Sequence, residues 1–231
     1  MALRPVIVSG PIISGAPEFR NRHEAGRRLA TMLVPLVAAH PVVLALPRGG
    51  VPVAFEVARR LHAPLGLLFA RKIGMPGAEE FGLGAIAAEG KGHAEPVLDE
   101  ALMRQVGITR EALVPAIRHQ RAEIARQQAE YGSVTPPING RVVVVVDDGI
   151  ATGGTMRAAL RVVHHHGALR VVLAVPVASS ETLADLAAEC DDMVCLATPS
   201  DFRAVGIHYA DFRQVEDDEV RNLLAQARTV T

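Results

Sequence analysis

Short apolar runs alternate along most of the chain with segments in which apolar residues recur every three or four positions. Such runs are typical of buried strands, and the longer spacing is typical of helices that cover a sheet. The predicted strands are residues 41–46, 64–70, 141–146, 170–177 and 193–198, and the predicted helices are residues 22–39, 51–62, 155–166 and 180–190. This alternation predicts an α/β fold: a Rossmann-like, parallel, five-stranded sheet with helices on both faces.

The stretch between the second and third predicted strands is too long for an ordinary connection of about 2–6 residues. Within it, "FGLGAIAAEG" (81–90) predicts one further short strand with Gly bends. Residues 108–131 predict an amphipathic helix, which Pro115 should begin or kink. Its apolar face carries Leu113, Ile117, Ile124 and Tyr131. We interpret residues 99–135 as a helical insertion in a single domain of residues 1–231; a helix over the sheet edge is favoured, and a partner-binding helix is left open.

The composition is that of a folded chain without the charge pattern of a nucleic-acid-binding protein. Of 231 residues, 49% are hydrophobic, and 24 Lys and Arg residues balance 25 Asp and Glu residues without a basic run. Nucleic-acid binding usually needs a basic face. The longest apolar stretches fall short of the roughly 20 residues of a membrane span, and the first residues lack the order of a signal peptide. We therefore expect a cytoplasmic protein with no nucleic-acid or membrane partner.

The segment "RVVVVVDDGIATGGTMRAAL" (141–160) carries the main chemical signal. Its valines predict a central strand buried on both faces, so Asp147 and Asp148 should emerge at the carboxyl end, where open α/β sheets bind ligands. The following turn leads into a helix and presents backbone N–H groups at its positive end, which suits a phosphate. Carboxylates would repel a bare phosphate, but they can accept hydrogen bonds from sugar hydroxyls or hold a Mg²⁺ shell. The predicted ligand is a sugar phosphate.

Two other interpretations compete for this segment. A carboxylate at a strand end also occurs in Walker B motifs, but the partner sequence G-x-x-x-x-G-K-S/T is absent from the chain. Plain helix capping explains the glycines and Thr155, but it does not explain two adjacent aspartates. The sugar-phosphate interpretation is therefore favoured.

Three segments together resemble the type I phosphoribosyltransferase family. "VVVVVDDGIATGGT" (142–155) is similar to the family's signature for phosphoribosyl pyrophosphate (PRPP), which is a hydrophobic strand, two acidic residues and T-G-G-T. "LPRGGVPVA" (46–54) is similar to the family's pyrophosphate loop, and Arg71 with Lys72 resembles the pair that follows the next strand in orotate-type members. The chain looks closest to loosely annotated bacterial members whose acceptor is unknown.

The resemblance implies a role for each segment. Arg48, Gly49 and Gly50, here called the pyrophosphate loop, would bind the diphosphate, because glycines let the backbone approach it and Arg48 can pair with it. Lys72, with Arg71 as a second candidate, would neutralise the departing diphosphate, so Arg48 and Lys72 are the predicted catalytic residues. Two alternatives are left open. Arg48 could be a solvated side chain in a tight turn, and Arg71 with Lys72 could be a solvated pair at a strand end.

The resemblance also implies the contacts of the sugar phosphate. Asp147 and Asp148 would hold the ribose hydroxyls, and they could contact Mg²⁺ through water. The 5-phosphate loop would consist of Ala151, Thr152, Gly153, Gly154 and Thr155. Residues 73–81 have the Gly and Pro content of a mobile lid.

The implied reaction displaces pyrophosphate from C1 of PRPP by a nitrogen acceptor, through an oxocarbenium-like transition state that needs Mg²⁺. A PRPP-sensing regulator with little catalysis is the alternative, and retention of Arg48 and Lys72 favours the enzyme. The predicted partners are PRPP and a small-molecule nitrogen acceptor, and a homodimer is left open.

The acceptor itself is not predicted. Ala151 stands where purine-salvage members carry Asp, which resembles uracil- or orotate-type members. In contrast, "VCLATPSDFRAVGIHYADF" (194–212) is similar to the base-binding tail of purine enzymes, where a Phe after a Pro stacks on the base. Phe202 is therefore a candidate acceptor contact, with a core Phe as the alternative. Residues 198–231 are interpreted as a C-terminal tail, or hood, that contributes to the acceptor site.

Overall fold

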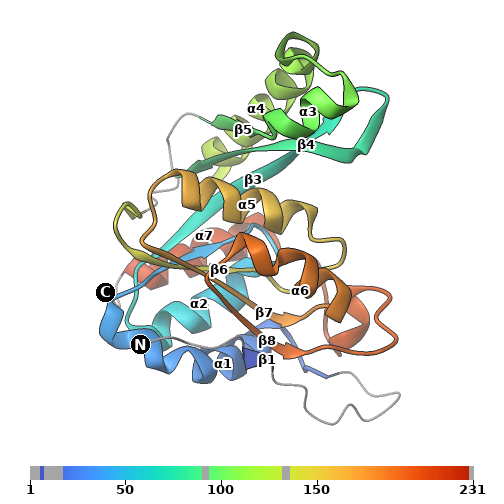
Figure 1. The fold of residues 1–231 in the computed structure, drawn as a ribbon. Coiled ribbons are helices and arrows are strands. Elements are labelled where there is room, and N and C mark those ends of the chain that lie inside the picture. Colours follow the sequence, from blue (N-terminus) through green and yellow to red (C-terminus); the bar gives the residue numbers. More distant parts are fainter. Residues whose placement is uncertain (1–5, 8–17, 90–93, 132–135, 229–231) are drawn as a thin grey trace.

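The computed structural model describes residues 6–7, 18–89, 94–131 and 136–228. Within these residues, the central sheet has eight strands in the order β1-β8-β7-β6-β2-β3-β4-β5 (Figure 1). The strands are β1 (Val6–Ile7), β2 (Val42–Ala45), β3 (Leu65–Met75), β4 (Ala78–Glu89), β5 (Glu95–Leu98), β6 (Val142–Val146), β7 (Arg170–Val177) and β8 (Asp192–Ala197). In this spatial order, each pair of neighbours from β1 through β8, β7, β6 and β2 to β3 is parallel. β4 pairs antiparallel with both β3 and β5. The α/β class is confirmed, but the predicted count of five strands is wrong.

Of the strands beyond these five, β4 corresponds to the further short strand predicted at 81–90, whereas β1 and β5 were not predicted. β1 has two residues, which is too short for a hydrophobic pattern. β3 continues past residue 70 through Arg71 and Lys72, where the polar side chains had suggested its end. It then turns through Pro76 and Gly77, whose φ of 80° favours glycine, into β4. Residues 73–81, the predicted lid, therefore form the tip of a hairpin.

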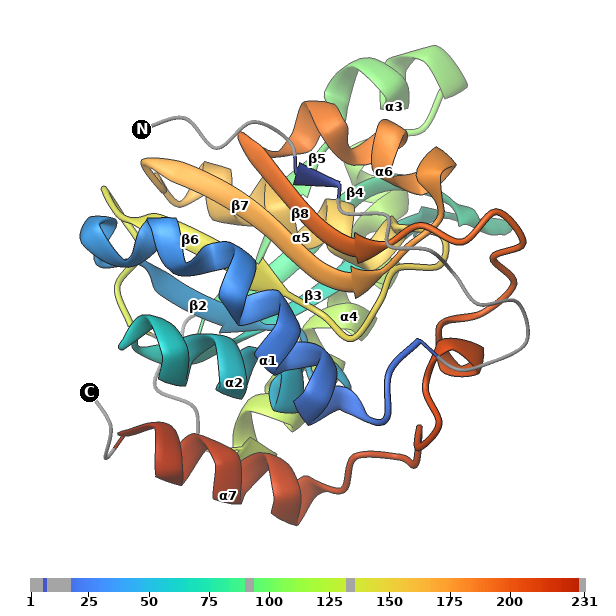
Figure 2. The same cartoon turned by 90° about the horizontal axis from the view of Figure 1, so that it is seen from below.

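Seven α-helices in the described part of the chain surround this sheet. They are α1 (Arg22–Leu33), α2 (Gly50–Leu61), α3 (Glu100–Val106), α4 (Arg110–Tyr131), α5 (Gly154–His165), α6 (Ser180–Leu186) and α7 (Asp217–Arg228). The predicted helix 22–39 is too long, because Pro35 cannot continue α1 and the chain becomes a 3₁₀ helix at Val34–Ala39. Figure 2 shows α1, α2 and α7 on one side of the sheet and α5 and α6 on the other.

The valines of β6 divide between the two faces as strand geometry requires. Val142, Val144 and Val146 belong to the apolar cluster under α1 and α2, whereas Val143 and Val145 belong to the cluster under α5. A strand buried on both faces leaves few polar positions until it ends, which explains why the first acidic side chains after β6 lie at its carboxyl end.

The inserted helices α3 and α4 fall within the predicted range 99–135, of which residues 132–135 lie outside the described part. α4 packs on β3 and β4, and its Leu113, Ile124 and Tyr131 are buried. Pro115 lies inside α4 and does not begin it. α7, in the C-terminal tail, was not predicted. Among the described residues, no helix has the length and apolar content needed to cross a membrane.

Candidate active site

The tandem aspartates lie in different surroundings although they are adjacent. The Arg22 Nε donates to Asp148 Oδ2 at 2.7 Å, and the two side chains are 11% and 13% exposed. The Tyr209 hydroxyl donates to the backbone carbonyl of Asp148 at 2.5 Å. Asp147 Oδ1 instead accepts from the Asp148 N–H at 2.9 Å. Asp148 is thus tied to α1 and to the tail.

These surroundings affect the acidity of the pair. Burial and the neighbouring charge of Asp148 hold the pKa of Asp147 well above its usual value. Burial also raises the pKa of Asp148, but the Arg22 guanidinium opposes that shift. The negative charge of Asp147 is therefore compensated less than that of Asp148, which pairs with Arg22.

The pyrophosphate loop follows β2 and begins with a cis peptide bond between Pro47 and Arg48. Its glycines pack directly against the aspartates. A Cβ on Gly49 would lie 2.2 Å from Asp148 Oδ2, and a Cβ on Gly50 would lie 2.8 Å from the carbonyl oxygen of Val146. Sequence reasoning assigned these glycines to the approach of a ligand. The structure gives them a second role. Because they lack a Cβ, the chain after β2 can pack closely against the chain after β6.

The 5-phosphate loop leads into α5 through Gly153, whose φ of 75° lies in the left-handed region. The Thr182 hydroxyl donates to the carbonyl of Ala151 at 2.8 Å, so the start of α6 holds this loop in place. A helix N-terminus that presents backbone N–H groups in this way suits a phosphate.

A cavity of about 260 Å³ contains Arg71, Asp147 and Thr155 of the predicted site residues, but Arg48, Gly49, Gly50 and Asp148 do not line it. It is lined by Leu46, Pro47, Leu68, Phe69, Ala70, Arg71, Gln127, Asp147 and Thr155. The end of β2, the end of β6 and the start of α5 thus meet in one space, as the sequence had indicated. Gln127, from the inserted helix α4, was not predicted.

Arg71 and Lys72 enter different cavities, because successive side chains on a strand point to opposite faces. Arg71 lines the cavity that contains Asp147. Lys72 lines a neighbouring cavity of about 240 Å³ beside Thr152, Gly154 and Arg157. The structure therefore places Arg71 with Asp147 and places Lys72 beside the 5-phosphate loop.

Arg48 reaches the C-terminal helix. Its Nη1 donates to Asp217 Oδ1 at 3.2 Å, and the Tyr131 hydroxyl donates to the same oxygen at 2.5 Å. The Tyr131 hydroxyl and the Arg48 guanidinium both lower the pKa of Asp217. Asp217 was not predicted as a site residue, because α7 was not predicted.

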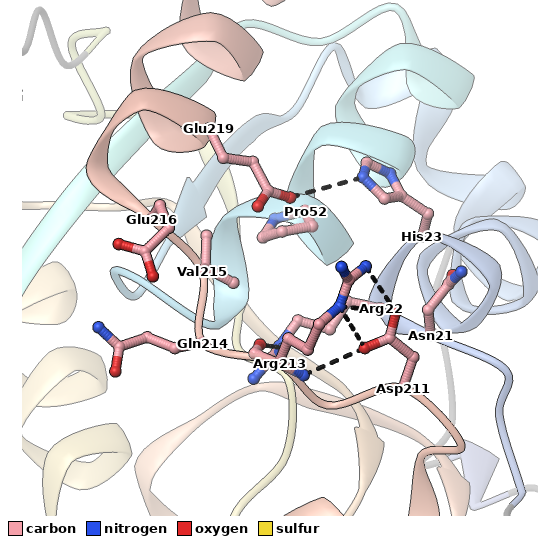
Figure 3. Close-up of a pocket in the computed structure, with 10 residues that line it drawn as sticks. All are labelled: Asn21, Arg22, His23, Pro52, Asp211, Arg213, Gln214, Val215, Glu216 and Glu219. Atoms are coloured by element: carbon pink, nitrogen blue, oxygen red, sulfur yellow. Dashed lines mark hydrogen bonds and ion pairs between the residues drawn. The ribbon is translucent and has the colours of Figure 1, made fainter.

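The tail contacts the aspartates through residues other than Phe202. The Phe202 ring stacks on His208 at 5.5 Å between centroids. Phe212 instead lies under Arg22, with 3.8 Å between its ring centroid and the guanidinium carbon. Figure 3 shows the pocket of about 420 Å³ that the tail forms with the start of α1 and with Pro52.

Comparison with known proteins identifies the family. The model of the phosphoribosyl transferase domain matches residues 28–211, a range that includes the pyrophosphate loop, the tandem aspartates and the 5-phosphate loop. The chain belongs to the phosphoribosyl transferase family. The predicted family resemblance is confirmed.

Relatives of this family member include two proteins named "Putative phosphoribosyl transferase" from Mycobacterium tuberculosis strains CDC 1551 / Oshkosh and ATCC 25618 / H37Rv. Each is 45% identical over 211 residues, which cover 90% of this chain and 47% of the relative. The chain thus spans about half the length of these relatives. The crystal structure of TT1426 from Thermus thermophilus is 44% identical, with a TM-score of 0.82 over 90% of this chain and 98% of that one.

The family resemblance implies Mg²⁺ with the diphosphate, and the carboxylates of the site fit such an ion. Arg22 binds the side chain of Asp148, which leaves Asp147 as the carboxylate that lines the cavity. In the part of the chain that the structure describes, no group of three His, Cys, Asp or Glu side chains could hold a metal by itself. Magnesium commonly binds through one or two carboxylates, substrate phosphates and several waters. Asp147 therefore suits an ion held mainly by the diphosphate, through water.

Asp147→Asn is expected to raise the melting temperature of the ligand-free protein at neutral pH. Because the folded protein raises the pKa of Asp147, stability falls as pH rises from the ordinary pKa of an aspartate through the raised one. Asparagine keeps an oxygen for the Asp148 N–H and carries no charge. Thermal unfolding between about pH 4 and about pH 8 should show a gain that grows with pH.

Asp148→Asn is the matched control for this measurement. It removes the carboxylate that pairs with the nearly buried Arg22, and an unpaired buried cation is destabilising. Because burial raises the pKa of Asp148 as well, removing its charge offsets part of this loss, and the melting temperature of this variant should stay below that of Asp147→Asn. Equal gains in both variants would show that the two aspartates do not differ as described.

Proposed function

We propose that the chain is a phosphoribosyltransferase that uses Mg-PRPP and transfers the phosphoribosyl group to a nitrogen acceptor, with release of pyrophosphate. The observation that carries this proposal is the cavity shared by Pro47, Arg71, Asp147 and Thr155. It brings an anion-binding helix start, a carboxylate and a cation together at the carboxyl ends of parallel strands. Family membership supports the general reaction.

In the proposed reaction, the acceptor nitrogen forms a bond to C1 while the bond from C1 to the diphosphate oxygen breaks. The electron pair of that bond leaves with pyrophosphate, and the nitrogen loses a proton. The 5-phosphate loop and Asp147 hold the phosphate and the ribose hydroxyls so that C1 is correctly placed. Bound Mg²⁺ supplies further neutralisation of the diphosphate.

Arg71 is the cation best placed to stabilise the leaving group. It is half-buried, it lines the cavity beside the pyrophosphate loop, and no described residue pairs with its guanidinium. A half-buried guanidinium without a carboxylate partner suits an anionic ligand, because phosphates accept its hydrogen bonds well. Arg48 is the second cation of the pyrophosphate loop, and Lys72 would act on the 5-phosphate.

A screen of labelled PRPP with Mg²⁺ against purines, pyrimidines, orotate and simple amines tests the proposal. The expected result is pyrophosphate release that depends on one class of acceptor. PRPP should also raise the melting temperature, and ribose 5-phosphate should raise it less, because a ligand of the folded state stabilises it by mass action. Tight PRPP binding without release from any acceptor would instead support a PRPP sensor. Absence of PRPP binding at millimolar concentration would rule out both functions.

A further inference from the structure

The inserted helix α4 does more than cover the edge of the sheet. Near its C-terminal end, Gln127 lines the cavity that also contains Arg71, Asp147 and Thr155. α4 packs on β3, so this end of the helix lies along the strand that carries Arg71. An element outside the family's sequence motifs therefore forms one wall of the candidate active site.

The Gln127 side chain is available for a ligand. It is half-buried, and no described residue hydrogen-bonds its amide. Because this amide remains accessible from the cavity, a polar ligand there can replace its hydrogen bonds to water. The neutral amide can donate to phosphate oxygens without adding charge to the cavity.

A second contact places this wall on the diphosphate side of the cavity. One helical turn beyond Gln127, the Tyr131 hydroxyl donates to Asp217, and Asp217 accepts from Arg48 of the pyrophosphate loop. Side chains four residues apart lie on the same face of a helix. The face of α4 that carries Gln127 and Tyr131 is thus linked to the pyrophosphate loop through Asp217.

From these contacts we infer that Gln127 is a substrate-contacting residue whose amide donates a hydrogen bond to the diphosphate of PRPP. The inference rests on the proposed function, because it names a further contact in the same site. It assigns the inserted helix a direct part in substrate binding, whereas the sequence had favoured a covering helix.

Calorimetric titration of Gln127→Ala and Gln127→Glu with Mg-PRPP and with ribose 5-phosphate tests the inference. Loss of a hydrogen bond to a charged phosphate should weaken PRPP binding about tenfold or more in Gln127→Ala. Gln127→Glu should weaken it further, because a carboxylate repels the diphosphate. Affinity for ribose 5-phosphate should stay at the parent level in Gln127→Ala, since that ligand lacks the diphosphate.

Gln120→Ala and Gln120→Glu are the matched controls. Gln120 is half-buried on the same helix, two turns earlier, and does not line the cavity. Both control variants should bind PRPP like the parent protein. If Gln127→Ala also binds PRPP like the parent, the inference is wrong while the proposed function stands. Equal losses for PRPP and ribose 5-phosphate would also overturn it, and a parent protein that does not bind PRPP would overturn both.

Discussion

Arg71→Ala is expected to lower the rate of pyrophosphate release about a hundredfold or more, whereas Lys72→Ala should mainly weaken PRPP binding. The two residues are adjacent in β3 but line different cavities. Arg71 lies with Pro47 and Asp147, and Lys72 lies with Thr152 and Gly154. The position of each cation relative to the charge that changes during the reaction determines the expected effect.

Charge grows on the diphosphate as its bond to C1 breaks, so a cation beside it acts most strongly in the transition state. The charge of the 5-phosphate does not change in this step. Removing a cation beside the 5-phosphate should therefore weaken the ground state and the transition state about equally, and raise KM with little effect on kcat.

Steady-state measurement of kcat and KM for PRPP, with the acceptor identified by the screen, distinguishes the two roles. Arg118→Ala, which removes an exposed cation from α4, serves as the control and should behave like the parent protein. A larger loss of kcat in Lys72→Ala than in Arg71→Ala would show that Lys72 acts on the leaving group.

The central strand and its site could be predicted because the relevant signals are local. A run of valines indicates a strand buried on both faces, and the carboxyl end of such a strand is where ligands bind. Asp147, Asp148 and the 5-phosphate loop follow directly from that position in the chain. The pyrophosphate loop follows β2 in the same way, but it was assigned from the resemblance of residues 46–54 to the family's loop.

The sequence could have predicted that Arg71 and Lys72 lie on opposite faces of the sheet. The predicted strand ended at residue 70, but β3 continues to Met75. A strand extended by two residues would have placed the two cations on opposite faces. Similarly, Val220, Leu223 and Leu224 have helical spacing and are buried in α7, so this helix could have been predicted from the pattern.

Other contacts had no local signal. Arg22 and Asp148 are 126 residues apart, and Arg48 and Asp217 are 169 residues apart. An acidic residue such as Asp217 is ordinary at the start of a helix, whereas a cation such as Arg22 is not. In neither case does the spacing indicate a partner so distant in the chain. The first pair forms where the start of α1 meets the end of β6, and the second forms where the tail returns to the pyrophosphate loop.

Gly50→Ala is expected to weaken PRPP binding about a hundredfold and to destabilise the fold by about 1–3 kcal/mol. The added Cβ would lie 2.8 Å from the carbonyl oxygen of Val146 and 2.9 Å from the Cα of Asp147. Both atoms are backbone at the end of a buried central strand, so neither can move without displacing the aspartates. The pyrophosphate loop must therefore shift away from Asp147.

Calorimetry with Mg-PRPP and thermal unfolding measure the two effects, and Gly107→Ala is the control substitution. Gly107 follows α3 and lines neither cavity of the site. Its φ of 70° strains any added Cβ, although no atom lies within 4 Å of that position. Gly107→Ala should therefore lose some stability but keep the PRPP affinity of the parent. If Gly50→Ala kept both the affinity and the stability of the parent, the pyrophosphate loop would not need its close approach to β6. The positions of Arg48 and Asp147 in one site would then require another explanation.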